Sequence, residues 1–180
     1  MAESSDILTT AIDAALALAA ERPWRAVSLR DIAERAEVDF AGLYAEAPSK
    51  PLLVLALSRK LDRAALATAA TASDDVHDRL FDAAMARIEA MQAHREALTS
   101  MAKGEGQIAI AIHLPLTARA ILEAAGVTSS PPRLAAMTLV WGRVVQVWRD
   151  DEGALNRTMA EIDKRLKQMR ERLKRIGAGF

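Results

Sequence analysis

The stretch SLRDIAERAEVDFAGLYAEAPSK, residues 28–50, decides the fold of this chain. It opens on Ser28, which can cap a helix, with Asp31 at the position where a capping box needs an acidic side chain. Apolar residues then recur at helical spacing, and after a break near Glu37 they do so again as far as Tyr44. Two short helices joined by a tight turn, with a small alanine where they cross, predict a helix-turn-helix.

The same stretch resembles the DNA-binding half of the TetR family, whose pattern is roughly S-L-R-D-I-A-x-x-A-G-V-S-x-G-T-L-Y-x-x-F-x-x-K. The matching positions are Ser28, Leu29, Arg30, Asp31, Ile32, Ala33, Ala36, Val38, Leu43, Tyr44 and Lys50. With the helix in front, the resemblance covers about the first third of the chain. It implies an all-α, TetR-like fold: a three-helix helix-turn-helix domain over residues 4–62 and a helical ligand-binding and dimerisation domain over residues 63–180.

Several positions depart from that pattern. Glu37 stands where the family has a turn glycine, so we expect either a left-handed Glu37, at a cost of about 1 kcal/mol, or a shifted turn. The second helix, expected from Asp39 to Glu46, contains no Lys or Arg. Residues 1–60 hold seven basic and nine acidic side chains, whereas DNA affinity rests largely on neutralising phosphates. The sequence therefore predicts the fold more strongly than it predicts DNA binding.

Composition limits the class of protein. The chain has 180 residues, 51% of them hydrophobic, and no cysteine, which excludes disulfides and Cys-zinc sites. His77, His94 and His113 are spaced too far apart for a metal-binding helix motif, and no catalytic constellation or phosphate loop is recognisable. We expect a soluble, cytoplasmic protein that is not an enzyme and needs no cofactor.

The C-terminal part carries a second strong pattern. Leu155, Met159, Ile162, Leu166, Met169, Leu173 and Ile176 follow one another at alternating spacings of four and three residues. This heptad seam needs a partner, and a two-fold dimer is the usual result. In the TetR resemblance the last two helices pair with their copies in a second subunit. The expected dimer interface is Trp141, Val145, Trp148, Met159, Ile162, Leu166 and Met169; the alternative is that the seam packs within its own subunit.

Two further sets of residues are candidates for binding. The resemblance implies DNA contacts by Tyr44 and Lys50 to phosphates and a groove-facing set, which together give Ser28, Asp39, Phe40, Gly42, Tyr44 and Lys50. An apolar pocket between helices is a common place for a small ligand. Its predicted lining is Met85, Ile88, Met101, Ile112, His113 and Met137, since methionine adapts to varied shapes.

Two functions remain open. The first is a TetR-type transcriptional regulator that binds double-stranded operator DNA as a homodimer and responds to an apolar small molecule. The second is a TetR-fold protein that has lost DNA binding and binds a lipid or isoprenoid. The second rests on a looser similarity of the C-terminal half to the TetR-like lipid-binding accessory protein of ubiquinone biosynthesis, and only there would the basic terminal helix meet a membrane surface.

Overall fold

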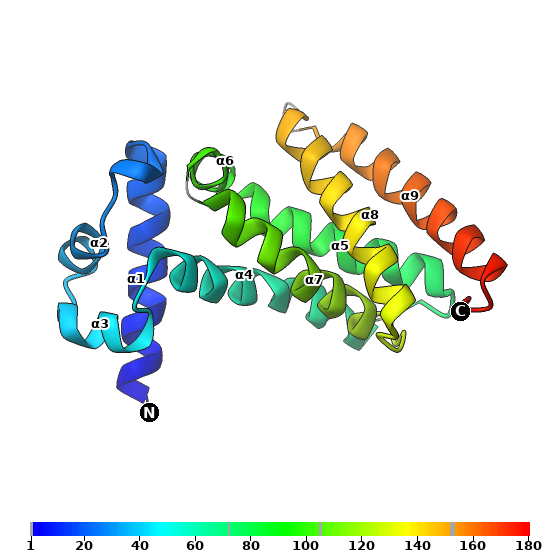
Figure 1. Cartoon of the computed structure of the whole chain (residues 1–180), viewed down its shortest axis with the longest axis horizontal. Helices are drawn as coiled ribbons and strands as arrows, with labels where there is room; N and C mark the ends of the chain where they lie inside the picture. The colour runs from blue at the N-terminus through cyan, green and yellow to red at the C-terminus, as the bar shows by residue number, and fades with distance from the viewer. Residues whose placement is uncertain (1, 72, 105, 152–153) are drawn as a thin grey trace. The chain divides into compact units, whose positions relative to one another are not determined.

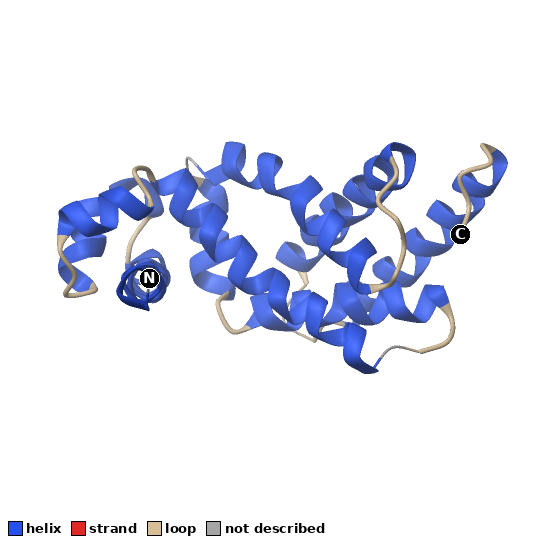
Figure 2. Ribbon diagram, turned by 90° about the horizontal axis from the view of Figure 1, so that it is seen from below, coloured by secondary structure: helices blue, strands red, loops and turns tan. Residues whose placement is uncertain are grey.

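The computed structural model describes residues 2–71, 73–104, 106–151 and 154–180, with the side chains of all but residues 2–5 and 106–112. Within these ranges the regular elements are helices and no strand occurs (Figures 1 and 2). In chain order they are α1 (Ala2–Glu21), η1 (Trp24–Ala26), α2 (Leu29–Arg35), α3 (Phe40–Glu46), α4 (Lys50–Ala67), η2 (Thr68–Thr71), α5 (Val76–Gln92), α6 (Arg95–Lys103), α7 (Gly106–Ala124), α8 (Pro131–Asp150) and α9 (Asn156–Arg175). The prediction of an all-α fold is confirmed.

The chain divides into two compact units. One contains the residues up to Arg59 together with His94–Ala111, and the other contains Lys60–Ala93 and Ile112–Phe180. Helix α6 therefore belongs with the N-terminal helices, a grouping that sequence reasoning did not anticipate. Helices α4 and α7 each contribute residues to both units.

The first unit is organised around α1, which packs against α2, α3 and α6. Trp24, which follows α1, is almost completely buried in its core. The Trp24 backbone N–H donates to Ser100 Oγ of α6 at 3.2 Å, so α6 is attached to the loop in front of the helix-turn-helix. The core is otherwise aliphatic and includes Ile32, Leu43 and Leu53.

The second unit is a helical bundle in which α9 packs against α8 and α5 (Figure 1). Its core is mostly apolar but contains a buried ionic cluster. Asp62 of α4 accepts hydrogen bonds from Arg87 Nε of α5 at 2.8 Å and from Thr117 Oγ1 of α7 at 2.9 Å. Because an uncompensated buried charge is costly, this cluster ties three helices together at defined positions.

The heptad seam of α9 is buried inside its own subunit. Ile162, Leu166 and Met169 are fully covered, and so are Trp141 and Trp148 of α8. A side chain that the monomer already covers offers no area to a second subunit, so the prediction that these five residues form the dimer interface is wrong. Of the seven predicted interface residues, Val145 is half-buried and Met159 is 36% exposed, which leaves those two on the surface.

Helix α7 is one helix with Pro115 inside it. The loop that precedes α8 includes Gly126, whose φ of +69° glycine adopts without strain, and Pro131 opens α8.

Candidate nucleic-acid interface

Helices α2 and α3 form the helix-turn-helix, and each is capped by its own sequence. Ser28 Oγ accepts the Asp31 N–H at 3.1 Å, and Asp31 Oδ2 accepts the Ser28 N–H at 2.7 Å, which completes the predicted capping box. These hydrogen bonds from Ser28, together with Arg22, lower the pKa of Asp31 below its usual value. The capping box therefore keeps a carboxylate at the N-terminus of α2 and fixes where the helix starts.

The turn between the two helices contains the strained residue that the sequence indicated. Glu37 has φ +55°, the left-handed conformation that a glycine would adopt at little cost. Asp39 then caps α3, because its Oδ2 accepts the Gly42 N–H at 2.8 Å. The turn keeps its register despite Glu37, so α3 starts at Phe40.

An aromatic pair covers the exposed face of α3. Phe40 is 37% exposed and Tyr44, one turn further on, is 53% exposed. Their ring centroids lie 6.2 Å apart at an interplanar angle of 54°. The guanidinium of Arg30, from α2, lies 5.4 Å from the centre of the Phe40 ring. Arg30 thus brings a positive charge to the face of a helix that has none of its own.

Sequence reasoning did not include Arg30 among the DNA-binding residues. The signal available was its place in the SLRD run, one residue after the start of α2. That position alone does not show that the side chain lies over an aromatic ring of the next helix. Only the crossing of α2 and α3 brings Arg30 to Phe40.

Gly42 faces away from this exposed surface. A Cβ built on Gly42 would lie 3.2 Å from Ile7 Cδ1 of α1. The prediction that Gly42 faces the groove is therefore corrected: two residues after Phe40, the helix has turned to the side that packs on α1. The absence of a side chain at Gly42 lets α3 approach α1 closely.

Lys50 is engaged inside the unit. Its ammonium donates to the Trp24 carbonyl oxygen at 3.1 Å and lies 4.9 Å from the centre of the Trp24 ring. Lys50 is half-buried at the start of α4 and fastens α4 to the loop before α2. A phosphate contact by Lys50 remains a prediction. The contacts of Lys50 with Trp24 also give it a role in holding the first unit together.

Ion pairs neutralise two of the arginines near the helix-turn-helix. Arg22 lies 3.1 Å from Asp31, and Arg35 lies 2.7 Å from Glu21. Arg30 is exposed, and among the described residues no carboxylate lies within ion-pair distance of it. The cationic group available to an anionic partner at this face is therefore Arg30, which lies beside Phe40.

The predicted ligand-binding residues are divided between the two units. Met85, Ile88, His113 and Met137 are buried in the second unit. Met101 belongs to the first unit, where it lies among Ile12, Ala15, Trp24, Leu53, Val54 and Leu57. The side chain of Ile112 lies outside the described residues. Four of the six predicted residues are therefore buried in the second unit, and Met101 lies in the first unit.

Among the described residues, no group of three His, Asp or Glu side chains is arranged to hold a metal ion. No described helix is both long enough and apolar enough to span a bilayer.

Both the sequence and the fold of this chain are similar to known proteins. Residues 11–57 match the family model described as "Bacterial regulatory proteins, tetR family". No curated protein matches the sequence. The crystal structure of a TetR transcriptional regulator from Rhodococcus sp. RHA1 is similar over 93% of this chain and 97% of its own, with 17% identity and a TM-score of 0.71. Residues 11–57 are therefore similar to the TetR family, and the chain has a TetR-like fold over nearly its whole length.

Proposed function

We propose that this protein is a transcriptional regulator that binds operator DNA through α2 and α3. The observation that carries the proposal is the exposed face of α3, where Phe40 and Tyr44 lie beside Arg30 on a capped helix-turn-helix. In this motif the second helix enters the major groove. Tyr44 and Lys50 then contact phosphates, Ser28 and Asp39 lie near the backbone and base edges at the helix starts, and Phe40 offers an apolar contact to a thymine methyl.

Arg30 is the residue that compensates for the missing positive charge of α3. Its guanidinium can donate to a phosphate or to guanine, and the Phe40 ring limits the directions it can take. Because Arg22 and Arg35 are paired with carboxylates, they contribute less to a favourable phosphate interaction. We therefore expect modest dependence of DNA binding on salt, with Arg30 as its main source.

Arg30 and Arg35 of α2 differ in that, within the described part of the chain, a carboxylate pairs with Arg35 alone. Arg30→Gln should weaken operator binding by about 1–3 kcal/mol, since it removes a direct DNA contact. Fluorescence anisotropy with the DNA upstream of the protein's own gene measures the change. Arg35→Gln removes the same charge from the same helix but from a side chain paired with Glu21, so it should change affinity by less than about 0.5 kcal/mol. Equal losses in the two variants would contradict the assignment of Arg30.

A homodimer would present two helix-turn-helix motifs to one DNA duplex. Leu139 of α8 is 73% exposed, and Met159 of α9 is exposed as well. A second copy covering this apolar surface through a two-fold axis would remove it from water. Two α3 helices about 34–36 Å apart would then enter successive major grooves of the duplex. The dimer proposed here uses the outer surface of α8 and α9 in place of the buried seam.

Regulation would take place in the second unit. Met85, Ile88, His113 and Met137 belong to the core in which an apolar small molecule would bind. Helix α4 supplies Asp62 to the buried cluster of that unit and Lys50 to the first unit. An effector that binds two arrangements of this core with different affinity would shift the population of DNA-competent dimers.

The acidic character of α3 favours one alternative, a TetR-fold protein that binds a lipid or isoprenoid without binding DNA. Helix α3 has no basic residue, and the exposed positions of α9 include Arg157, Lys164, Lys167, Arg170, Arg172, Lys174 and Arg175. Such a helix suits an anionic membrane surface. Titrating salt against random duplex DNA separates the two functions. Binding near about 50 mM salt that weakens as the salt concentration rises supports the regulator, and no binding near about 50 mM salt supports the alternative.

A further inference from the structure

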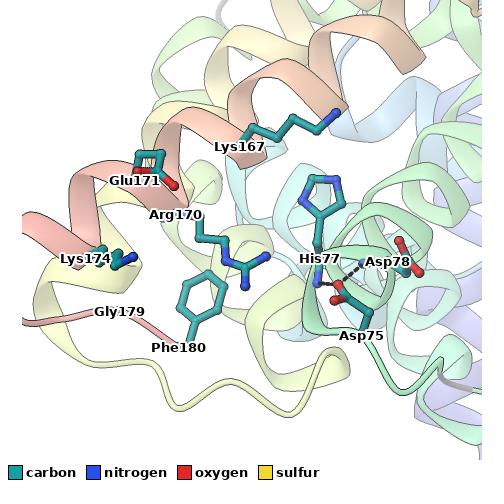
Figure 3. Close-up of a pocket in the computed structure, with 9 residues that line it drawn as sticks. All are labelled: Asp75, His77, Asp78, Lys167, Arg170, Glu171, Lys174, Gly179 and Phe180. Carbon is teal, nitrogen blue, oxygen red and sulfur yellow. Dashed lines mark hydrogen bonds between the residues drawn. The ribbon is translucent and has the colours of Figure 1, made fainter.

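A cleft in the second unit is lined by residues that belong neither to the helix-turn-helix nor to the buried core. It has a volume of about 790 Å³. One wall is the start of α5, with Asp75, His77 and Asp78; the opposite wall is the second half of α9, with Lys167, Arg170, Glu171 and Lys174. Gly179 and Phe180 form the third side (Figure 3). This volume falls in the range of small-molecule sites.

Hydrogen bonds hold each wall in place. His77 Nε2 lies 3.0 Å from Asp163 Oδ1, which joins the first turn of α5 to α9. Arg133 of α8 donates through Nε to the Ala178 carbonyl oxygen at 3.0 Å and through Nη2 to that of Gly179 at 2.7 Å. Its guanidinium also lies 5.8 Å from the centre of the Phe180 ring. The cleft is therefore bounded by three segments that are fixed to one another.

The chain end passes close to α9 at Gly179. A Cβ added there would lie 3.4 Å from the Lys174 Cα. The turn that brings the chain back uses Gly177, whose φ is +69°. These two glycines allow the residues after α9 to fold beside it and place Phe180 at the cleft.

The α5 wall has two carboxylates, of which Asp78 accepts one hydrogen bond from Ser73 Oγ at 3.4 Å and Asp75 accepts two. Asp75 Oδ1 accepts the backbone N–H groups of His77 at 2.6 Å and Asp78 at 3.3 Å. These two hydrogen bonds lower the pKa of Asp75, and Arg170 lowers it further from across the cleft. Asp163, behind the cleft, accepts from Lys167 Nζ at 2.8 Å and pairs with His77. These carboxylates are therefore committed to the protein itself.

Two cations of the α9 wall remain available. Arg170 and Lys174 are one helical turn apart and both line the cleft. Among the described residues neither side chain makes a hydrogen bond, and no carboxylate lies within ion-pair distance of either. Figure 3 shows Arg170 extending from α9 towards the α5 wall. Glu171 is the remaining acidic group of this wall, so the α9 wall keeps a net positive charge.

We propose that this cleft binds a small organic anion in which a carboxylate or phosphate group is attached to a flat ring. Arg170 and Lys174 receive the anionic group, since a guanidinium donates to two oxygens of a carboxylate or phosphate in a fixed plane. Phe180 provides an aromatic surface for the ring. The proposal does not depend on DNA binding, because its residues and those of the α2–α3 surface are separate sets.

The test is calorimetric titration of the full chain with phenyl phosphate, benzoate and inorganic phosphate at low salt. At least one of the two aromatic anions should bind more tightly than inorganic phosphate, and the tighter of the two identifies the preferred anionic group. The double variant Arg170→Gln with Lys174→Gln should weaken that binding by about tenfold, the combined loss expected for two partly exposed charge contacts.

A matched variant makes the outcome decisive. Arg172→Gln with Arg175→Gln removes two exposed charges from the same helix that do not line the cleft. It should change the affinity by less than about twofold. An equal loss in both double variants would show a general charge effect and overturn the proposal. Failure of both aromatic anions to bind, or binding of inorganic phosphate with equal affinity, would overturn it too. All four positions are exposed, and circular dichroism of each variant checks that it folds.

Discussion

Glu37 adopts a strained backbone conformation in the turn between α2 and α3. Its φ of +55° lies where a side chain beyond glycine is strained, and the strain amounts to about 1 kcal/mol. The turn nevertheless forms because the capping of α2 by Ser28 and of α3 by Asp39 fixes the helices on both sides. At this scale the local hydrogen bonds of the helix-turn-helix outweigh the conformational preference of Glu37.

Replacement of this residue gives a prediction about stability. Glu37→Gly should raise the free energy of unfolding by about 0.5–1 kcal/mol, because glycine adopts the left-handed conformation without a Cβ clash. In thermal unfolding this corresponds to an increase in Tm of about 1–4 °C. Glu37→Ala removes the same carboxylate but keeps the Cβ, so it should not produce the increase. A gain of the same size in both variants would mean that the charge of Glu37, and not its backbone conformation, limits stability.

At the scale of elements, α9 is an amphipathic helix that the rest of its own subunit covers. Its buried side contains Ile162, Leu166, Met169 and Leu173, and its outer side is mostly Lys and Arg. It starts after Leu155, whose φ of +55° turns the chain back from α8, and packs on α8 and α5. The same heptad pattern that indicates an intersubunit seam thus describes a helix of a single bundle.

The buried position of Leu166 predicts a large effect on folding. Leu166→Ala should lower the free energy of unfolding by about 2–5 kcal/mol, because it removes buried methyl groups and leaves a cavity. Urea denaturation followed by circular dichroism measures this change. Lys164→Ala, on the exposed side of α9, should cost less than about 0.5 kcal/mol. If Leu166→Ala instead produced a monomer of unchanged stability, the seam would belong to an intersubunit contact after all.

At the scale of the whole molecule, the proposed function requires two chains to assemble. On α8 and α9 the large apolar side chains that stay exposed are Leu139 and Met159. The proposed regulator needs two copies of α3 on one duplex, because a single α3 with so little positive charge has little affinity of its own. Dimer formation and operator binding should therefore be lost together.

Leu139→Glu tests that expectation. A carboxylate in the centre of the proposed interface would be buried without a partner, so sedimentation equilibrium should show monomers and operator affinity should fall by about tenfold or more. Leu52→Glu, on the exposed surface of α4, introduces the same change outside the proposed interface and should leave the dimer intact. A dimer that persists in Leu139→Glu would place the interface on another surface.

The sequence by itself determined the features that depend on near neighbours in the chain. The Ser28 capping box, the break near Glu37 and the burial of one face of α9 follow from residues a few positions apart. Hydrogen bonds of caps and turns, and the helical repeat, act over this range, so their pattern can be read directly.

Only the tertiary structure decided which surfaces meet. Helical periodicity shows that a face of α9 is buried, but it contains no information on whether α8 of the same chain or of another covers it. In the same way, the crossing of helices turns Gly42 towards Ile7, brings Arg30 to Phe40 and assigns Met101 to the first unit. Burial of apolar area stabilises any of these pairings, and the choice among them depends on the shapes of surfaces that are distant in sequence.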